Sequence, residues 1–578
     1  MTTPSFTTFR GALSRRRPGL TDVVVFVAVV LVLYAIIRLG RGMTVSFAPT
    51  DVTTIDTSPS RLPYYAARSL LRMFIALGVS TVFTLVYGYV AARSRRAEKV
   101  LVPILDVLQS VPILGFLSIT VTAFIALAPG SLLGLEMAAV FAIFTSQAWN
   151  MTFSFYQSVA TLPRELDELS RNFRFTRWMR FWKVEVPHAA IGLTWNAMMS
   201  FGGGWFFLSA AEAISVLHSS YALPGIGSYA AAAIDAGDLR EVWFAIVTMV
   251  VVVLAVNFFF WRPLIAFSER YKLELSEAAD APRSHFLDVL RGTRWPALLG
   301  RLRRRVADPL GRAMAVFGTD TRPLRVDPLR RNVGDAVFGL LVGAAIAWGL
   351  VSLIGYTVER DGLGVYLTTF WLGFVTMLRV LVLVAVATVV WVPVGVKIGM
   401  SRRWSRLAQP VVQILASFPA NFLFPFATLA FIHFGVTLDL GGILLMSLGA
   451  QWYILFNVIA GAQAIPSDLR EAMDDLGVTG WQRWRRLVLP AVFSSYVTGG
   501  ITASGGAWNA SIVAEIVTYG GTTLTATGLG AYIAEASKAG DFAKILAGVA
   551  VMSLYVVGIN RVLWRRLYRL AESRYSLS

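Results

Sequence analysis

Side chains that could carry out chemistry are few in this sequence, and they are not grouped as a catalytic site. The 578 residues include no cysteine, which excludes disulfide bonds, thiolate catalysis and cysteine-based metal sites. The four histidines show no ligand spacing, so we expect no metal site; they are His188, His218, His285 and His433. No Gly-Lys pair occurs, although the phosphate-binding loop of an ATPase needs one. We therefore expect that the chain is not an enzyme and holds no cofactor of its own.

Two glutamates inside apolar segments are the exception. Glu212 and Glu515 each follow a tryptophan, Trp205 and Trp508, by seven residues. Seven residues make almost two helical turns, so each pair shares one helix face. Because a carboxylate inside a membrane is costly, it marks a functional site by default. Two interpretations stay open: a contact that holds a gate or caps backbone amides, and a contact with a transported solute.

The elements that carry these residues are predicted to be membrane-spanning helices. Hydrophobic residues make up 56% of the chain and charged residues only 15%, and apolar stretches recur near the length that crosses a bilayer. Six spans are predicted in the first half, near 22–39, 69–91, 100–128, 134–160, 188–216 and 241–262. Six more are predicted in the second half, near 333–355, 374–397, 405–433, 440–461, 491–518 and 541–562. The predicted fold class is an all-α polytopic membrane protein.

The net charge of +18 favours a membrane topology over a nucleic-acid partner. Arginine and lysine gather in loops that flank the predicted spans on one side, and the opposite loops are poor in them. Basic loops stay in the cytosol, so both termini are expected there. A basic cytosolic linker is predicted over 268–332, as a tether between the halves that also carries short amphipathic helices on the anionic leaflet.

The two halves are copies of one another. Gly203, Trp205 and Glu212 recur as Gly506, Trp508 and Glu515, and the Gly225–Tyr229 element recurs as Gly528–Tyr532. Six spans per copy is an even number, so the copies run parallel and are related by a pseudo-twofold axis along the membrane normal. The predicted repeats are 1–267 and 333–578.

A polar loop with one residue pattern follows the fourth predicted span of each copy, at 161–187 and at 464–490. The second loop carries Glu471, Ala472, Gly477, Trp481, Trp484 and Pro490. The first keeps Glu168, Trp178 and Pro187 at the same spacing but has Arg174 in the place of Gly477. Glycine permits a sharp turn between two short helices, and a side chain at this position is expected to obstruct it.

This loop pattern resembles the signature of permease subunits of ABC importers, in which Glu-Ala-Ala precedes a glycine and a closing Ile-x-Leu-Pro. Within that superfamily the chain is most similar to permeases of the nitrate, sulfonate and taurine type. The similarity includes the Pro112 and Pro419 turns of the third spans, the Trp–Glu pairs and the Gly-x-Gly elements. It implies the type I ABC importer permease fold in the inner membrane, with each loop docked on an ATPase.

The resemblance also implies partners and a transport path. The partners would be two copies of an ABC ATPase, which bind the ATP and Mg, an extracytoplasmic substrate-binding protein and the lipid bilayer. The path or its gate would include Trp205, Glu212, Trp508, Asn509, Glu515, Arg72, Arg379, Pro112 and Pro419. Arg72 and Arg379 are candidate partners of the glutamates or candidate guides for an anion. Asn509 has Phe206 as its counterpart, so the path is expected to be asymmetric.

The function implied is import of a small anion, such as nitrate, a sulfonate or bicarbonate. In such an importer the glutamates are expected to hold a gate, because bare carboxylates would repel the cargo. One alternative is an ion-driven secondary transporter with parallel repeats, which would need ionisable groups near the midplane but no matched loops. A second alternative is an ABC importer of a neutral or cationic solute.

Overall fold

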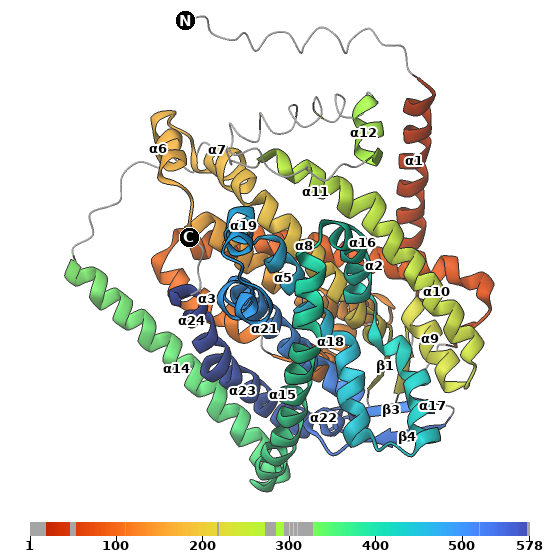
Figure 1. Ribbon diagram of the computed structural model, residues 1–578. Helices are drawn as coiled ribbons and strands as arrows, with labels where there is room; N and C mark the ends of the chain where they lie inside the picture. The colour runs from red at the N-terminus through yellow and green to blue at the C-terminus, as the bar shows by residue number, and fades with distance from the viewer. Residues whose placement is uncertain are drawn as a thin grey trace, which may run out of the picture.

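The computed structural model describes residues 19–46, 54–109, 111–216, 219–271, 285–293, 300, 305, 309, 328–519 and 521–574 (Figure 1). Almost all of these residues are helical, as the composition predicts. Most of the predicted linker, and with it most of the predicted amphipathic helices, lies outside the described residues. Within the linker the structure describes α12 (His285–Gly292) and the start of the next helix at Pro328.

The two halves contain the same sequence of elements. In the first half these are α1 (Leu20–Arg41), α2 (Leu62–Arg93), α3 (Arg95–Leu108), α4 (Leu117–Leu127), α5 (Leu133–Ala160), α6 (Arg164–Asn172), α7 (Arg177–Arg180), α8 (Val186–Glu212), β1 (Ala213–Val216), β2 (Ser219–Ala222), α9 (Ile226–Asp235), α10 (Leu239–Val256) and α11 (Arg262–Ser268). In the second half these are α14 (Pro328–Asp361), α15 (Gly364–Gly399), α16 (Arg402–Ser417), α17 (Phe424–Phe434), α18 (Leu438–Gln463), α19 (Ser467–Asp475), α20 (Gly480–Arg483), α21 (Leu489–Ala514), β3 (Ile516–Tyr519), β4 (Thr522–Thr525), α22 (Leu529–Ala539), α23 (Phe542–Ile559) and α24 (Arg565–Arg574).

The described residues include eight helices that are long and apolar enough to cross a membrane, or nine if the bent pair α16–α17 counts as one. Two further helices, α5 and α8, are 28 and 27 residues long and stand where α18 and α21 stand in the second half. Each of the twelve predicted segments therefore contains helix, in the same order in both halves. This is the duplicated architecture that the sequence predicts.

The third predicted span of each half is not one continuous helix, which corrects the sequence prediction. In the first half α3 ends at Leu108, and a 3-10 turn over Ile113–Phe116 leads into α4. In the second half α16 ends at Ser417, and the chain bends by 85° before it continues toward α17. Proline lacks the N–H of a helical hydrogen bond and disfavours helical geometry in the residue before it, which explains breaks at Pro112 and Pro419.

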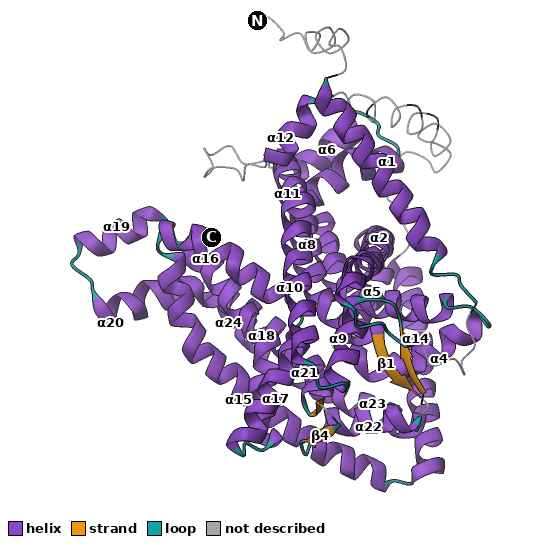
Figure 2. Cartoon of the chain, turned by 90° about the vertical axis from the view of Figure 1, so that its right-hand side faces the viewer, coloured by secondary structure: helices purple, strands orange, loops and turns teal. Residues whose placement is uncertain are grey.

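The fifth predicted spans are shorter than the sequence indicates. Helices α8 and α21 end at Glu212 and Ala514, and each is followed by a two-stranded antiparallel hairpin, β1–β2 and β3–β4. Strands β3 and β4 are rich in β-branched residues, which favour extended backbone, whereas β2 contains none. In both views the strands lie at the end of the molecule away from α6 and α19 (Figures 1 and 2).

Two large apolar cores are centred one in each half, and the core around Trp508 also takes in first-half residues such as Leu114, Leu117 and Ala139. In the first half the core forms between α2, α5, α8 and α10, and Trp205 and Phe201 lie in it. In the second half it forms between α15, α18, α21 and α23, and includes Trp508. The fifth helix of the first half, α8, also lies against α16 of the second half, so the halves meet along their fifth helices and broken third helices.

Candidate functional site

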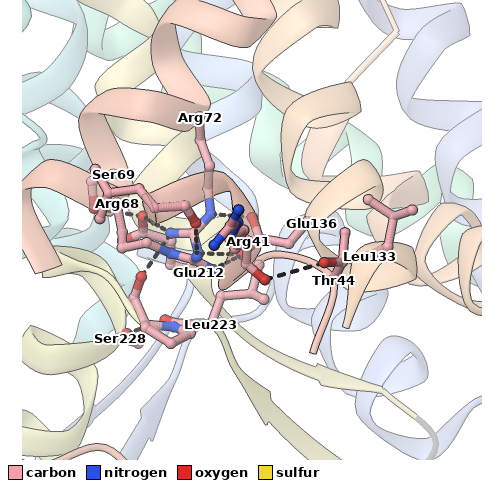
Figure 3. Close-up of polar contacts among 12 residues, drawn as sticks. Arg41, Thr44, Arg68, Ser69, Arg72, Leu133, Glu136, Glu212, Leu223 and Ser228 are labelled. Atoms are coloured by element: carbon pink, nitrogen blue, oxygen red, sulfur yellow. Dashed lines mark hydrogen bonds and ion pairs between the residues drawn. The ribbon is translucent and has the colours of Figure 1, made fainter. Parts of the chain in front are cut away.

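A buried ionic cluster lies where α8 ends. Glu212 is fully buried, and its Oε1 lies 2.7 Å from Nη1 of Arg72 on α2 (Figure 3). Nε of Arg72 lies 2.6 Å from Oε2 of Glu136, in the first turn of α5. The hydroxyl of Ser69 donates to Glu212 at 2.6 Å. The cluster therefore joins α2, α5 and α8, and it brings together two residues that the sequence singled out.

The Glu212 carboxylate also accepts a hydrogen bond from the N-terminus of α9. The backbone N–H of Gly227 donates to Oε2 of Glu212 at 2.7 Å, and that of Ile226 donates to the Ser69 hydroxyl at 3.0 Å. A negative charge at a helix N-terminus is favourable, because the first N–H groups have no partner within the helix. A Cβ atom at Gly225 would lie 2.2 Å from the Glu212 carboxylate, so only glycine fits there.

The second half repeats this arrangement. Glu515 lies 2.9 Å from Nη1 of Arg379 and accepts a hydrogen bond from the Thr376 hydroxyl at 2.8 Å. The N–H of Gly530, near the start of α22, donates to it at 2.8 Å. Arg379 also contacts Asp439 of α18 at 2.5 Å, as Arg72 contacts Glu136.

One residue distinguishes the two clusters. Arg68 is fully buried in the first half, contacts Glu136, and donates to the Leu39 carbonyl of α1 at 2.6 Å. Its counterpart by spacing is Val375. The first cluster therefore holds two arginines and two carboxylates and also fastens α1, whereas the second holds one arginine and two carboxylates.

Trp205 and Trp508, which the sequence predicted for the path or its gate, are both buried, and Trp205 borders a small cavity that is also lined by Gln413, Ile414 and Ser417 of the second half. Trp205 is 1% exposed and packs edge-on against Phe201, with ring centres 5.6 Å apart. Trp508 stacks on Tyr555 at 6.2 Å. Each tryptophan therefore packs against an aromatic side chain of its own half.

A cavity of about 50 Å³ lies between the two halves. It is lined by Gly202, Gly203, Phe206, Phe207, Ala416, Phe418, Ala420, Gly449, Tyr453, Gly506, Asn509 and Ala510. The first four belong to α8, and the others belong to the second half. Of the residues predicted for the path, only Asn509 lines this cavity, and no lining residue is charged. The residues that line the cavity are mostly small or aromatic, and the Trp–Glu pattern in the sequence did not point to them.

Asn509 connects the halves. Its Oδ1 accepts from the backbone N–H of Ile113 at 2.8 Å, directly after the break at Pro112. On the opposite side, Nδ2 of Asn421, just after Pro419, donates to the Ser209 hydroxyl of α8 at 2.9 Å. The two proline breaks therefore each present a polar group to the fifth helix of the other half, with different side chains. Asn421 and Ser209 carried no signal in the sequence.

The hydrogen bonds described between the halves are neutral and ion pairs lie inside each half, although Asp235 and Lys538 attract one another across the seam without forming a close ion pair. At the end of the molecule that carries the β-strands, the Tyr519 hydroxyl donates to the Gly237 carbonyl at 2.9 Å. The hydroxyls of Ser118 and Ser537 also contact one another there. All ion pairs between described side chains join residues of the same half. The halves can therefore separate without breaking an ion pair among the described residues.

The two predicted loops have the same backbone. Each forms a short helical hairpin, α6–α7 and α19–α20, closed by equivalent hydrogen bonds. Phe175 N–H donates to Ser170 O at 3.0 Å, and Val478 N–H donates to Met473 O at 2.9 Å. Gly477 has φ 63° and Arg174 has φ 47°, so both turns pass through the left-handed region.

This corrects the expectation that a side chain obstructs the turn. Arg174 occupies the position in the first hairpin, and a Cβ atom at Gly477 would meet nothing within 4 Å. The cost of a side chain there is therefore confined to the backbone, about 1–2 kcal/mol.

The hairpins present apolar side chains on their surfaces. Leu476 is 75% exposed and Trp481 is 71% exposed, and the nearby Glu471 and Ala472 are exposed as well. Trp484 is half-buried against the core of the second half.

The first hairpin is more enclosed. Trp178 is half-buried and packs edge-on against Trp182 at 5.6 Å, and Glu168 and Arg174 are exposed. Pro187 and Pro490 lie in the first turns of α8 and α21, where a missing N–H costs little.

A buried ionic network anchors only the first hairpin. Nε of Arg180 lies 3.0 Å from Oε1 of Glu185, and its Nη2 lies 2.5 Å from Asp167. The same Glu185 oxygen contacts Arg93, at the end of α2. Val488 stands in the place of Glu185 in the second half. The first hairpin is therefore tied to both α8 and α2.

Within the described residues, no group of three or more His, Asp or Glu side chains could hold a metal ion. The site therefore consists of a neutral cavity between two helical halves, two buried ionic clusters near the hairpin strands, and two exposed helical hairpins at the other end. These features define a duplicated helical membrane protein whose two halves meet along a common seam.

The chain belongs to the family of binding-protein-dependent transport system inner membrane components, whose model matches residues 84–262 and again 391–576. The family model matches once in each half, in agreement with the duplication. The chain is thus a multi-pass ABC transporter permease with the type I fold, present twice.

Individual relatives share limited identity. The chain is 28% identical over 202 residues to the bicarbonate transport system permease protein of Synechococcus elongatus, covering 35% of this chain and 68% of the relative. It is 27% identical over 200 residues to the nitrate import permease protein of Synechocystis sp., covering 35% and 67%. It is 25% identical over 203 residues to the taurine transport system permease protein of Escherichia coli, covering 34% and 70%.

Proposed function

We propose that this chain is the complete transmembrane part of an ABC importer for a small anion. One chain would supply both halves of the path, at 1–267 and 333–578, with the linker at 268–332 and both termini in the cytosol. The observation that carries this proposal is the pair of matched helical hairpins, because they lie at equivalent places in both halves and expose apolar side chains.

The hairpins would each dock one ATPase subunit. Leu476 and Trp481 on the second hairpin are exposed apolar anchors of the kind that dominate protein interfaces. Two hairpins imply two ATPase copies, which would bind and hydrolyse the ATP with Mg. The first hairpin would pass their motion to α8 and α2, and the second would pass it to α21.

At the other end, the ionic clusters would hold each half rigid. Glu212 and Glu515 are fully paired and buried away from the cavity, which supports a structural or gate role over a contact with cargo. An extracytoplasmic binding protein would deliver the anion at the end of the chain that carries these ionic clusters.

Nitrate, bicarbonate and sulfonates are favoured as cargo because the relatives named above import such anions. A second candidate is a neutral zwitterion, since the chain is also 26% identical over 167 residues to a glycine betaine permease protein of Bacillus subtilis.

The experiment that tests the partners is affinity purification of the tagged chain from its own membranes, followed by native mass spectrometry. We expect one chain with two copies of an ATPase. Recovery of the chain alone under several mild detergents would contradict the proposal.

A further inference from the structure

The cavity between the halves offers few polar groups to a solute. Ten of its twelve lining residues are glycine, alanine or phenylalanine, and the other two are Asn509 and Tyr453. An anion that loses water on entering such a space needs hydrogen-bond donors in exchange, because an unpaired buried charge is very unfavourable. The two polar side chains are therefore the only side-chain candidates among the lining residues.

Asn509 is already engaged. Its oxygen accepts from Ile113 N–H at 2.8 Å, and its amide donates to the Gly505 carbonyl at 3.2 Å. The first bond crosses the seam between the halves and the second lies within α21, so using Asn509 for cargo would break one or both.

Tyr453 is not engaged in this way. Its side-chain hydroxyl has no hydrogen-bond partner among the described residues, and it lies on α18 beside the cavity. A Cβ atom on Gly203 of α8 would be 3.0 Å from this oxygen, so the hydroxyl reaches across the seam to the other half. Its counterpart by spacing is Asn150, which donates to Ser200 within the first half at 3.4 Å. The free donor therefore comes from one half only.

We propose that the Tyr453 hydroxyl donates a hydrogen bond to the oxyanion group of the cargo while the cargo passes between the halves. A hydroxyl binds an anion through a short, charge-assisted hydrogen bond and carries no net charge that would trap the anion. This inference rests on the proposed function. It names the group recognised, an oxyanion, which nitrate, bicarbonate and sulfonates share.

The test is Tyr453→Phe in the complete complex of chain, ATPase and binding protein, reconstituted in liposomes. The probes are nitrate, bicarbonate and 2-aminoethanesulfonate, each at saturating binding protein, so that the binding protein's own affinity does not limit uptake. The matched control is Tyr496→Phe, since the Tyr496 hydroxyl pairs with Thr388 inside the second half and lines no part of the cavity.

We expect Tyr453→Phe to lower uptake of the transported oxyanion by about ten-fold or more, the effect of one hydrogen bond to a charged group. ATP hydrolysis should stay within about two-fold of wild type, so more ATP is used per anion. Tyr496→Phe should change neither. Gly203→Ala, which pushes a methyl group against the hydroxyl from the other half, should lower uptake in the same direction.

Unchanged uptake by Tyr453→Phe would overturn the inference. So would a parallel loss of uptake and hydrolysis, which indicates a structural role, or an equal loss in Tyr496→Phe. If the wild-type complex carries out no ATP-driven uptake of any of the three anions, the proposed function fails as well, and the two failures are thereby distinguished.

Discussion

Arg72 and Arg379 are buried, and each holds two carboxylates, of which only Asp439 is exposed. Arg72 lies 2.6 Å from Glu136 and 2.7 Å from Glu212, and Arg379 makes the equivalent contacts with Asp439 and Glu515. Removing one partner of a buried pair leaves an uncompensated charge, which is far worse than never having had the pair. Glu212 and Glu515 also accept hydrogen bonds from the N-termini of α9 and α22, so each of these side chains fixes several elements.

The first prediction is at this scale. Glu212→Ala should lower the free energy of unfolding by about 3–5 kcal/mol, because Arg72 loses a partner and α9 loses its N-terminal acceptor. Glu212→Gln keeps part of the hydrogen bonding and should cost less. The measurement is thermal unfolding of the purified chain in detergent, followed by tryptophan fluorescence.

The control for this prediction is the exposed pair between Asp56 and Arg61. Hydrogen bonds from Ser58, together with one from Arg61, hold the pKa of the Asp56 carboxyl below its ordinary value, but the group is open to solvent. Asp56→Asn should therefore leave the unfolding temperature unchanged. A Glu212→Ala chain that unfolds at the wild-type temperature would contradict the stabilising role of the Arg72–Glu212 pair.

The two helical hairpins, α6–α7 and α19–α20, have the same backbone although their sequences differ at the turn. Arg174 and Gly477 adopt similar left-handed backbone, although only one is glycine. The hairpins share their hydrogen bonds, but only the first has the buried network of Arg180 and Glu185.

The second prediction exchanges the turn residues. Arg174→Gly should stabilise the first hairpin by about 1 kcal/mol, because glycine tolerates positive φ. Gly477→Arg should destabilise the second hairpin by a similar amount and lower stimulated ATP hydrolysis only in part. The measurement is ATP hydrolysis stimulated by loaded binding protein. Complete loss of hydrolysis in Gly477→Arg would show that the ATPase, rather than the hairpin, rejects the side chain.

The third prediction concerns the anchor of the first hairpin. The double variant Arg180→Met with Glu185→Val makes the first hairpin like the second at residue 185 and avoids a lone buried charge. We expect ATPase binding to persist while uptake per ATP falls, since the hairpin loses its tie to α2. The matched control is Arg483→Met, whose pair with the exposed Asp474 should matter little. Normal uptake per ATP in the double variant would argue that α8 alone transmits the motion.

Much of this architecture follows from the sequence, because duplication, apolar length and proline position are local signals. The pairing of Arg72 with Glu212 could be anticipated from matching positions in the two halves. The β-strands could not be predicted, since the two or three β-branched residues of β1 and β3 directly follow a helix and extend the same apolar run. Tyr453 was also missed, because its role depends on which face of α18 meets the other half, and periodicity does not fix that in a helix buried on several sides.

At the scale of the whole molecule, the halves are internally bound by ion pairs and joined to each other by neutral hydrogen bonds and by apolar contacts in the core around Trp508. Neutral hydrogen bonds are individually weak in net terms, about 0.5–1.5 kcal/mol, and are readily exchanged. This division favours rigid halves that separate at the seam.

The fourth prediction locks that seam. The chain has no native cysteine, so Ser118→Cys with Ser537→Cys introduces a single defined pair at a place where the two hydroxyls touch. If the halves must separate at the end that carries the β-strands, the oxidised, cross-linked protein should lose uptake and regain it after reduction. Each single cysteine variant should transport normally. Full uptake by a chain shown to be cross-linked would contradict separation of the halves at this end.

The central claim is that ATP hydrolysed by separate subunits drives an anion through this chain. The most direct measurement is uptake of labelled nitrate, bicarbonate or 2-aminoethanesulfonate into liposomes that contain the chain, with ATPase, binding protein and ATP each omitted in turn. We predict uptake of at least one anion that needs all three components and is unaffected by collapsing proton and sodium gradients. Uptake by the chain alone, driven by an ion gradient and indifferent to ATP, would contradict the account.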